Sequence, residues 1–360
     1  MRDTTSTAAV QRLGEQWIRE LARPGGGGFV CSPAGLWLAL TAVAAGARTE
    51  TAAELRTLLG VAGPEAAAVV TEAARDWERT EALNVATRVW SRLTVRQEYK
   101  DALPGIAFGP VGQDEIDAWV CERTGGLIER LPMELDGVSF ALVNALALKA
   151  LWETPFEVNR TREVPFTDEA GRIRPAATMH APVPVRDVWT VAGAHVVELR
   201  CRTERGGAAP ARIRLVLGEP GAGAAQVLPA AWASREERVP LDADEVTVAV
   251  PRFTLRTNIQ VDDQLPALGV RRATTMALAD FSGLSRQPAC ISDVVQEAVL
   301  KVAEEGVEAA AVTVVALRTS VARPGRHIAF TRPFGIVVLD GSSDVPLFAG
   351  WQADIPAYEG

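Results

Sequence analysis

The sequence predicts an α+β fold that forms a single domain over residues 1–360. Helical periodicity comes first along the chain and strands dominate later, an order typical of α+β folds rather than of doubly wound α/β folds. The Gly- and Pro-rich clusters at Pro24–Gly28 and Gly218–Ala224 are short and lie between apolar runs. We therefore find no linker that would divide the chain, although its length alone suggests about two domains.

The first helical and strand elements follow one another closely. Ser6–Leu21 has apolar residues at helical spacing, and the glycine cluster ends it. Phe29–Cys31 is typical of a short strand, after which Ser32 and Pro33 indicate an N-cap and a first helical turn. The apolar helix Ala34–Ala45 follows, and Thr49 is the expected cap of the next helix, which ends at Gly60.

The rest of the chain contributes mainly strands, with two further helices. Helices are expected at Asp114–Arg130, interrupted by Gly125 and Gly126, and at Val261–Leu268. Expected strands lie at Leu83–Leu93, in the long apolar run Val138–Trp152, at several places between Glu163 and Pro240, in Val246–Arg256, and as two strands around the turn Gly341–Asp344.

Composition restricts the possible classes of function. The 360 residues are 48% hydrophobic and 23% charged with a net charge of -8, which is ordinary for a globular protein with a large core. The acidic balance and the lack of a basic stripe argue against a nucleic-acid partner. No apolar stretch reaches the length of a membrane span, so no membrane contact is expected. The N-terminus lacks the apolar segment of a secretory signal, so we expect a cytoplasmic protein if the chain is complete and a secreted one if a signal was trimmed.

No pattern indicates an enzyme, a metal site or a cofactor. The three histidines, His180, His195 and His327, have no metal-ligand spacing, and no GxSxG motif is present. The PGGGG segment does not follow a strand and lacks the lysine of a phosphate-binding loop. The cysteines lie far apart without a CxxC pair and are expected to be buried free thiols: Cys31, Cys121, Cys201 and Cys290.

The stretch Glu304–Pro324, EEGVEAAAVTVVALRTSVARP, combines features that do not fit one ordinary element. A period of two places Val307, Ala309, Ala311, Thr313 and Val315 on one uncharged face, as in a strand that packs on a core. Apolar runs flank the stretch on both sides without turn residues, and the whole is longer than a usual strand. A surface helix or a plain loop is the alternative, opposed by Gly306 and the β-branched residues.

Several blocks of the sequence resemble the serpin family of serine protease inhibitors, including its bacterial members. The hinge block is VQEAVLKVAEEGVEAAA. The others, in the family's order, are CSPAGLWLALTAVAAGARTETAAELRTLLG, LVNALALKALWETPF, PRFTLRTN, GVRRATTMALADFSGLS and RPFGIVVLDGSSDVPLFAG. The match covers nearly the whole chain except for Gly63–Thr80 and Val196–Arg235.

The resemblance implies a serpin fold with three β-sheets, about eight or nine helices and an exposed reactive loop at about residues 304–326. It also implies suicide inhibition, in which a serine protease cleaves the loop and the loop then enters the main sheet as a new strand, carrying the acyl-linked protease with it. The expected partner is a target serine protease, and the protein is expected to be a monomer.

The scissile bond is placed by counting about sixteen residues from Glu304, which gives Ser320 and Val321 on its two sides. Counting back from the Phe330 block places the bond one or two residues later. Arg318, followed by Thr319, is the other candidate and would attract trypsin-like proteases. A small residue such as Ser320 suits elastase-like or subtilisin-like proteases.

The resemblance also assigns supporting positions. The hinge comprises Glu304, Glu305, Gly306, Val307, Glu308, Ala309, Ala310 and Ala311, with Val307 replacing the usual Thr or Ser. Ser32, Gly35, Asn144 and Gln296 correspond to a polar cluster beneath the sheet, called the shutter, and Gln296 replaces a frequent His. Trp152, Arg252 and Glu304 lie where the loop first enters, called the breach, and an Arg252–Glu304 ion pair is expected.

A non-inhibitory serpin, acting as a carrier or folding factor and merely cleaved in its loop, is the alternative function. The hinge has neither Pro nor bulky charge, which favours the inhibitor. Activation by heparin-like polymers is not expected, because the region after Gly60 carries Arg75 and Arg79 but no basic helix face.

Overall fold

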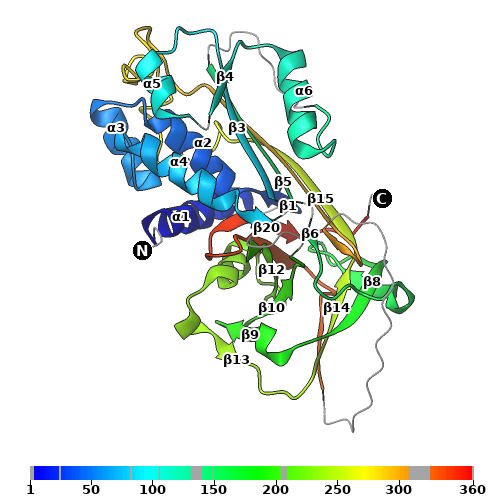
Figure 1. Ribbon diagram of the computed structural model, residues 1–360. Helices are drawn as coiled ribbons and strands as arrows, with labels where there is room; N and C mark the ends of the chain where they lie inside the picture. The colour runs from blue at the N-terminus through cyan, green and yellow to red at the C-terminus, as the bar shows by residue number, and fades with distance from the viewer. Residues whose placement is uncertain are drawn as a thin grey trace.

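The computed structural model describes residues 4–23, 26–81, 83–104, 106–130, 140–148, 150–203, 209–307 and 325–358. Helices gather at one end of the molecule, beside a long upright sheet, and two further sheets fill the other end (Figure 1). This segregation confirms the α+β class. The described α-helices are α1 (Thr4–Leu21), α2 (Pro33–Ala44), α3 (Thr49–Leu59), α4 (Glu65–Trp77), α5 (Gln97–Ala102), α6 (Gln113–Thr124) and α7 (Ala224–Val227).

Three large sheets are present, as predicted. In the central five-stranded sheet the order is β15 (Phe253–Gln260), β16 (Asp293–Val302), β5 (Phe140–Leu148), β3 (Leu83–Ser91) and β4 (Ala107–Gly109). The seven-stranded sheet runs β1 (Phe29–Cys31), β20 (Pro346–Gln352), β19 (Phe334–Leu339), β12 (Arg212–Leu217), β10 (Ala194–Arg200), β9 (Val188–Val191) and β13 (Val239–Pro240).

The four-stranded sheet consists, in order, of β18 (Arg326–Ala329), β14 (Val246–Pro251), β8 (Ile173–Val183) and β7 (Arg162–Thr167). Two short pairs complete the strands: β11 (Ala209–Pro210) with β2 (Thr80–Glu81), and β17 (Gly306–Val307) with β6 (Ala150–Leu151). Short 3-10 helices are η1 (Val158–Arg160), η2 (Val185–Asp187), η3 (Leu228–Trp232) and η4 (Arg235–Glu237).

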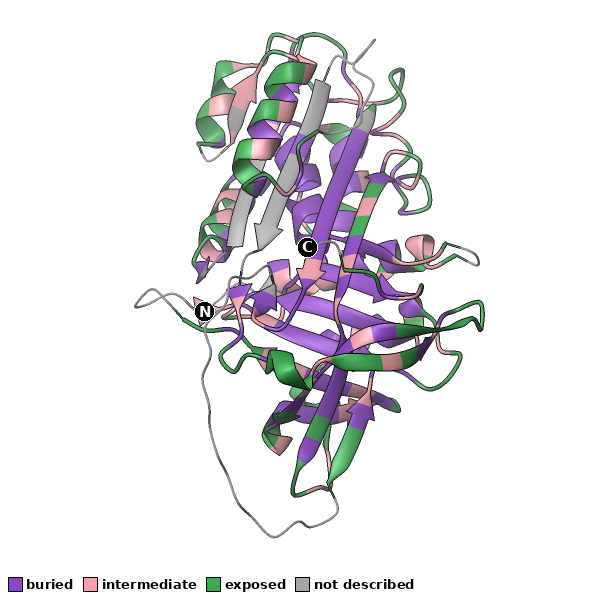
Figure 2. Cartoon of the chain, turned by 90° about the vertical axis from the view of Figure 1, so that its right-hand side faces the viewer, coloured by how far each residue is buried: buried purple, intermediate pink, exposed green. Residues whose placement is uncertain are grey.

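Burial is concentrated in the strands that run through the middle of the molecule (Figure 2). Both β19 and β20 are buried along their whole length. The N-terminal helices pack against them: Trp17 of α1 and Trp37 of α2 are fully buried in the same core. The first strand and helix form as predicted, since the Ser32 hydroxyl accepts a hydrogen bond from Gly35 N and Pro33 opens α2.

Several details differ from the sequence prediction: α4, α5 and α7 were not predicted, and α6 ends at Thr124 rather than at Arg130. Val261–Leu268 forms consecutive turns rather than a helix, and the described residues contain seven α-helices rather than eight or nine. Thr49 is not a cap, because Arg48 holds that position and the Thr49 hydroxyl donates to Asp280 instead. The long strand β8 was not predicted, and the C-terminal region adds β18 to the two strands expected there. No described helix is long and apolar enough to span a membrane.

Candidate functional site

The hinge begins where β16 leaves the central sheet. After Val302 the chain turns sharply through Glu304 and Glu305, and the turn is closed by a hydrogen bond from Ala303 N to Gly306 O of 3.0 Å. Gly306 is required here, because a Cβ atom at this position would lie 2.2 Å from the carbonyl oxygen of Ala150. The hinge therefore reverses the chain direction within four residues.

The first two hinge residues after this turn already pair as a strand. Gly306 lies opposite Leu151 and Val307 opposite Ala150, in an antiparallel register. β6 is a short continuation of the chain beyond β5, so the start of the hinge occupies a position between the ends of β16 and β5. The peptide N–H of Trp152, which follows β6, donates to Glu305 O at 2.9 Å and secures the turn from the same side.

Next to the hinge, the central sheet is incompletely paired. β16 pairs with β15 at eight positions and β3 with β5 at nine, whereas the parallel pairing of β16 with β5 covers only Asp293–Val295 and Ala141–Val143. Within the described strands, the rest of β16 has no recorded strand partner on the β5 side until Ala303 meets Gly306. The sheet thus has an interval between these strands, bounded by three residue pairs at one end and by the hinge at the other.

Glu304 connects the hinge to two neighbouring elements. Its carboxylate accepts hydrogen bonds from Arg252 Nε at 2.7 Å, from a terminal nitrogen of Arg252, and from Thr161 Oγ1 at 2.5 Å. The predicted ion pair is therefore present, with the Glu304 side chain 6% exposed and that of Arg252 29% exposed. Burial alone would raise the pKa of Glu304, but the hydrogen bonds from Arg252 and Thr161 outweigh it and hold the pKa below its usual value.

Two aromatic residues complete the breach. Trp152 is buried and its indole N–H donates to Ala303 O at 2.9 Å, while Phe156 N donates to Glu304 O at 2.8 Å. The two rings meet edge to face with centroids 6.4 Å apart. Phe156 and Thr161 were not among the predicted residues, since nothing in the β6–β7 connection distinguishes them in the sequence. All of the predicted breach residues lie together.

The polar cluster beneath the sheet links β16 to the start of α2. The Gln296 side chain accepts from Ser32 N at 2.6 Å and donates to Ser32 O at 3.1 Å, and the Ser32 hydroxyl donates to Leu347 O at 2.6 Å. Ser32 and Gln296 are 1% and 4% exposed. The amide thus satisfies both backbone groups of Ser32 with a side chain that does not titrate, and Gly35 N completes the cluster through the Ser32 hydroxyl.

The remaining predicted residues have no described side chains. Asn144 lies in β5, opposite Thr87, and only its backbone is described. The end of the hinge and both candidate scissile bonds fall outside the described residues: Glu308, Ala309, Ala310, Ala311, Arg318, Thr319, Ser320 and Val321.

The two faces of β16 meet different surroundings. Leu300 and Val302, with Val294 and Ala298, belong to the main core. Val295 and Val299 join a second cluster that includes Trp119 of α6 and Trp90 of β3. Any strand placed beside β16 would therefore need small or apolar residues on the core face, and also on the other face next to Val295 and Val299.

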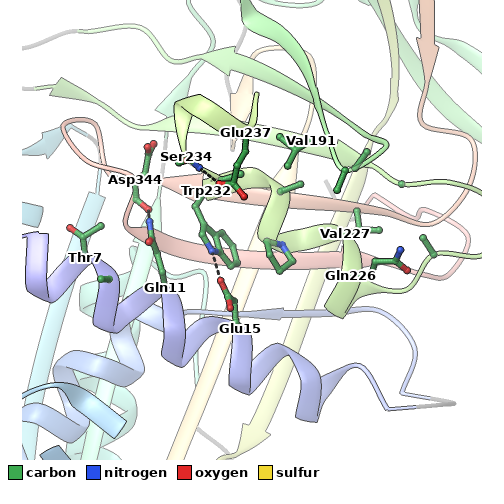
Figure 3. Close-up of a pocket in the computed structure, with 18 of the residues that line it drawn as sticks. Thr7, Gln11, Glu15, Val191, Gln226, Val227, Trp232, Ser234, Glu237 and Asp344 are labelled. Atoms are coloured by element: carbon green, nitrogen blue, oxygen red, sulfur yellow. Dashed lines mark hydrogen bonds between the residues drawn. The ribbon is translucent and has the colours of Figure 1, made fainter. Parts of the chain in front are cut away.

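A separate cavity of about 750 Å³ lies between α1 and the connection from α7 to η4. Thr7, Gln11 and Glu15 face it from α1, opposite Gln226 and Trp232, and the Trp232 indole N–H donates to Glu15 at 3.3 Å (Figure 3). None of the described hinge, breach or shutter residues lines this cavity. It is therefore distinct from the described part of the candidate site.

Comparisons with known proteins agree with this architecture. The family model of serpins, described as serine protease inhibitors, matches residues 8–355. Iripin-3 from Ixodes ricinus is 29% identical over 97% of this chain and 94% of its own length, and serine protease inhibitor 42Dd from Drosophila melanogaster is 28% identical over 88% of each. The solved structure of tengpin, a thermophilic serpin in its native state, is similar with a TM-score of 0.83 at 20% identity, covering 98% of this chain and 95% of that one.

Proposed function

The chain belongs to the serpin family, and we propose that it is a suicide-type inhibitor of serine proteases. In this proposal the protease serine attacks the carbonyl carbon of Ser320, the amine of Val321 leaves, and the resulting acyl-enzyme is trapped when the freed loop enters the central sheet. Arg318 and Thr319 form the alternative bond. The observation that carries the proposal is the interval between β16 and β5, with the hinge already paired at its entrance.

The register of the hinge supports insertion in a single frame. Gly306 faces Ala303 on one side and Leu151 on the other. Advancing one residue at a time along the loop, and one residue back along each neighbour, brings Val314 between Val295 and Val143. These two residues are themselves a pair in the present sheet. The loop can therefore replace that contact without a change of register in either strand, once the two strands have moved apart by about one strand width, roughly 4.8 Å.

The same register distributes the loop residues between the two faces. Residues directly opposite in an antiparallel pair share a face. Ala309 would lie opposite Leu300 and Ala311 opposite Ala298, both in the main core. Glu308 would lie opposite Lys301, which is partly exposed. This arrangement matches the uncharged face expected from the period of two.

The energy available from insertion is sufficient to trap a protease. A central strand of about ten residues gains backbone hydrogen bonds to both neighbours, each with a net contribution of about 0.5 to 1.5 kcal/mol, or on the order of 10 to 20 kcal/mol in all. That is comparable to the whole stability of an ordinary domain, about 5 to 15 kcal/mol. The intact protein would then be held in a kinetically trapped state until its loop is cut.

The proposal is tested by mixing the protein with elastase-like, subtilisin-like and trypsin-like proteases. We expect SDS-resistant complexes and a released C-terminal peptide whose mass corresponds to a chain starting at Val321. Proteases that prefer a small residue before the scissile bond should react best. A peptide beginning at Thr319 would move the bond to Arg318. Cleavage by every protease without any complex would refute the inhibitor and favour the non-inhibitory alternative.

A further inference from the structure

The outer face of the four-stranded sheet carries a concentration of basic side chains. The inner face is buried, with Val246, Val248 and Met179 exposed by no more than 1%. The cross-strand register places His180 of β8 and His327 of β18 on the opposite face, on either side of β14. Their rings are stacked with an interplanar angle of 5° and centroids 6.3 Å apart.

Arginines surround the two histidines. A cavity of about 490 Å³ lies at this face and at the start of β18, and its basic lining residues are Arg160, Arg162, Arg326, His180 and His327. Arg326 is opposite Val246 in the register, so it lines the cavity at the end of β18 rather than from the outer face. We call these five residues the basic cluster. Among the residues that the structure describes, no carboxylate lines this cavity, in a chain whose net charge is -8. The cluster is thus a local positive patch on an acidic protein.

The hydrogen bonds inside the cluster leave its positive charge largely uncompensated. His180 Nδ1 lies 3.1 Å from Thr178 O and 3.2 Å from Arg160 O, which can only accept, so this nitrogen carries a proton. In the neutral ring Nε2 is then the acceptor for Arg162, 3.3 Å away. Arg160 forms an exposed ion pair with Glu157, whereas Arg162 and Arg326 have no carboxylate partner within the described part of the chain.

The cluster lies at the carboxyl side of the reactive loop. Arg326 is the first residue of β18 and follows Gly325, where the described chain resumes after residues 308–324. A protease bound to the loop would stand over this end of the four-stranded sheet. Charges within about 10 Å of its surface would interact with it before salt screens them.

We propose that the basic cluster is a docking site for carboxylates on the surface of the target protease, outside the protease's substrate cleft. This inference rests on the proposed inhibitory function and adds a determinant of which protease is selected. Arginine favours such a role because its planar donors bind carboxylates in pairs and lose little hydration. Exposed charges of this kind act mainly on the rate of association. The cluster should therefore raise the association rate constant for proteases whose surfaces carry carboxylates.

The test is a charge reversal at one position in β7 and at the first residue of β18, where the reactive loop ends. Arg162→Glu and Arg326→Glu are combined, both positions being exposed, and association rate constants are measured with proteases of equal cleavage preference but acidic or basic surfaces. We expect the rate with the acidic-surfaced protease to fall about tenfold at low salt, and the difference to disappear at high salt. The number of inhibitor molecules used per trapped protease should not change. Arg75→Glu combined with Arg79→Glu, two exposed positions at and just beyond the end of α4, is the control matched in charge and should leave the rate unchanged.

Several outcomes would overturn the docking site. One is an equal rate for the double variant and the wild type at both salt concentrations; another is a loss that salt does not abolish. If the double variant inhibits normally but no longer binds a sulfated polysaccharide that the wild type binds, the cluster serves a polyanion instead. Failure of all proteases to form complexes with the wild type would refute the proposed inhibition itself. This outcome can be distinguished from a failure of the docking site alone, in which the wild type still forms complexes.

Discussion

Replacing Val307 by arginine should convert the inhibitor into a substrate. Extending the pairing of Gly306 with Ala303 by one residue places Val307 opposite Val302. Val302 is 1% exposed and belongs to the main core. In the inserted strand an arginine at this position would be directed into that core. Because Val307 already pairs with Ala150, the arginine would lie at the entrance through which the later loop residues have to pass.

The size of the effect follows from the competition between insertion and deacylation. A buried charge without a partner costs about 3 to 5 kcal/mol, and about 1.4 kcal/mol corresponds to a tenfold change in rate. A penalty at the lower end would slow the first step about 100-fold. Complete insertion could remain favourable overall, yet the protease would usually hydrolyse its acyl-enzyme first.

The assay is a titration of a fixed amount of protease with intact Val307→Arg protein, followed by SDS gels that separate complex from cleaved inhibitor. We expect many molecules to be cleaved for each protease trapped. Glu308→Arg is the control, since its position should lie beside the partly exposed Lys301 on the other face. Normal complex formation by Val307→Arg, or an equal defect in Glu308→Arg, would refute the assignment of faces.

Two further predictions concern the stability of the intact protein. Glu304→Gln should lower the free energy of unfolding at neutral pH by about 1 to 3 kcal/mol, because charge-assisted bonds to a buried carboxylate are lost. The pKa of Glu304 is depressed in the folded state, so the stability that its carboxylate contributes is present above the unfolded pKa and is lost as the pH falls through the folded pKa. Urea unfolding should therefore show the free energies of unfolding of the two proteins becoming equal in acid. A difference that stays constant with pH would contradict this. Gln296→Ala should cost about 1 to 3 kcal/mol in thermal or urea unfolding, because the buried N–H of Ser32 loses the side chain that accepts from it, while the Ser32 carbonyl keeps its bond from Leu36 N. Gln260→Ala, an exposed change in the same sheet, should cost almost nothing, and equal losses in the two variants would show that the cluster has no special role.

The success of sequence prediction depended on how local each signal was. The Ser32–Pro33 start of α2 was predicted because a cap and a proline act within one turn. The helix expected at Val261–Leu268 is replaced by turns, and Pro266 within it removes a backbone donor. β8 was missed because it contains Pro175 and Pro182; Pro175 pairs with Pro165 of the edge strand β7, where missing donors are tolerated.

The candidate site divides in the same way. The Arg252–Glu304 contact was expected from the family resemblance and is present. Thr161 donates to the same carboxylate from the connection between β6 and β7. The path of that connection depends on the whole fold, so no sequence pattern predicts this contact. The pairing of Gly306 with Leu151 is likewise a property of how two distant strands end, and only the structure reveals it.

The three residue pairs between β16 and β5 hold these two strands together at the end of the sheet that is far from the hinge. A loop strand that advances from Gly306 meets no competing strand until it reaches them, so its early bonds are gained without breaking any others. The β16–β5 hydrogen bonds would be broken only late, when most of the loop strand is already paired, and each would be replaced by bonds from the loop to both neighbouring strands. Under the proposed mechanism, weakening these three pairs should therefore change the rate at which the intact protein converts spontaneously to the inserted form, more than it changes how quickly a cleaved loop begins to insert.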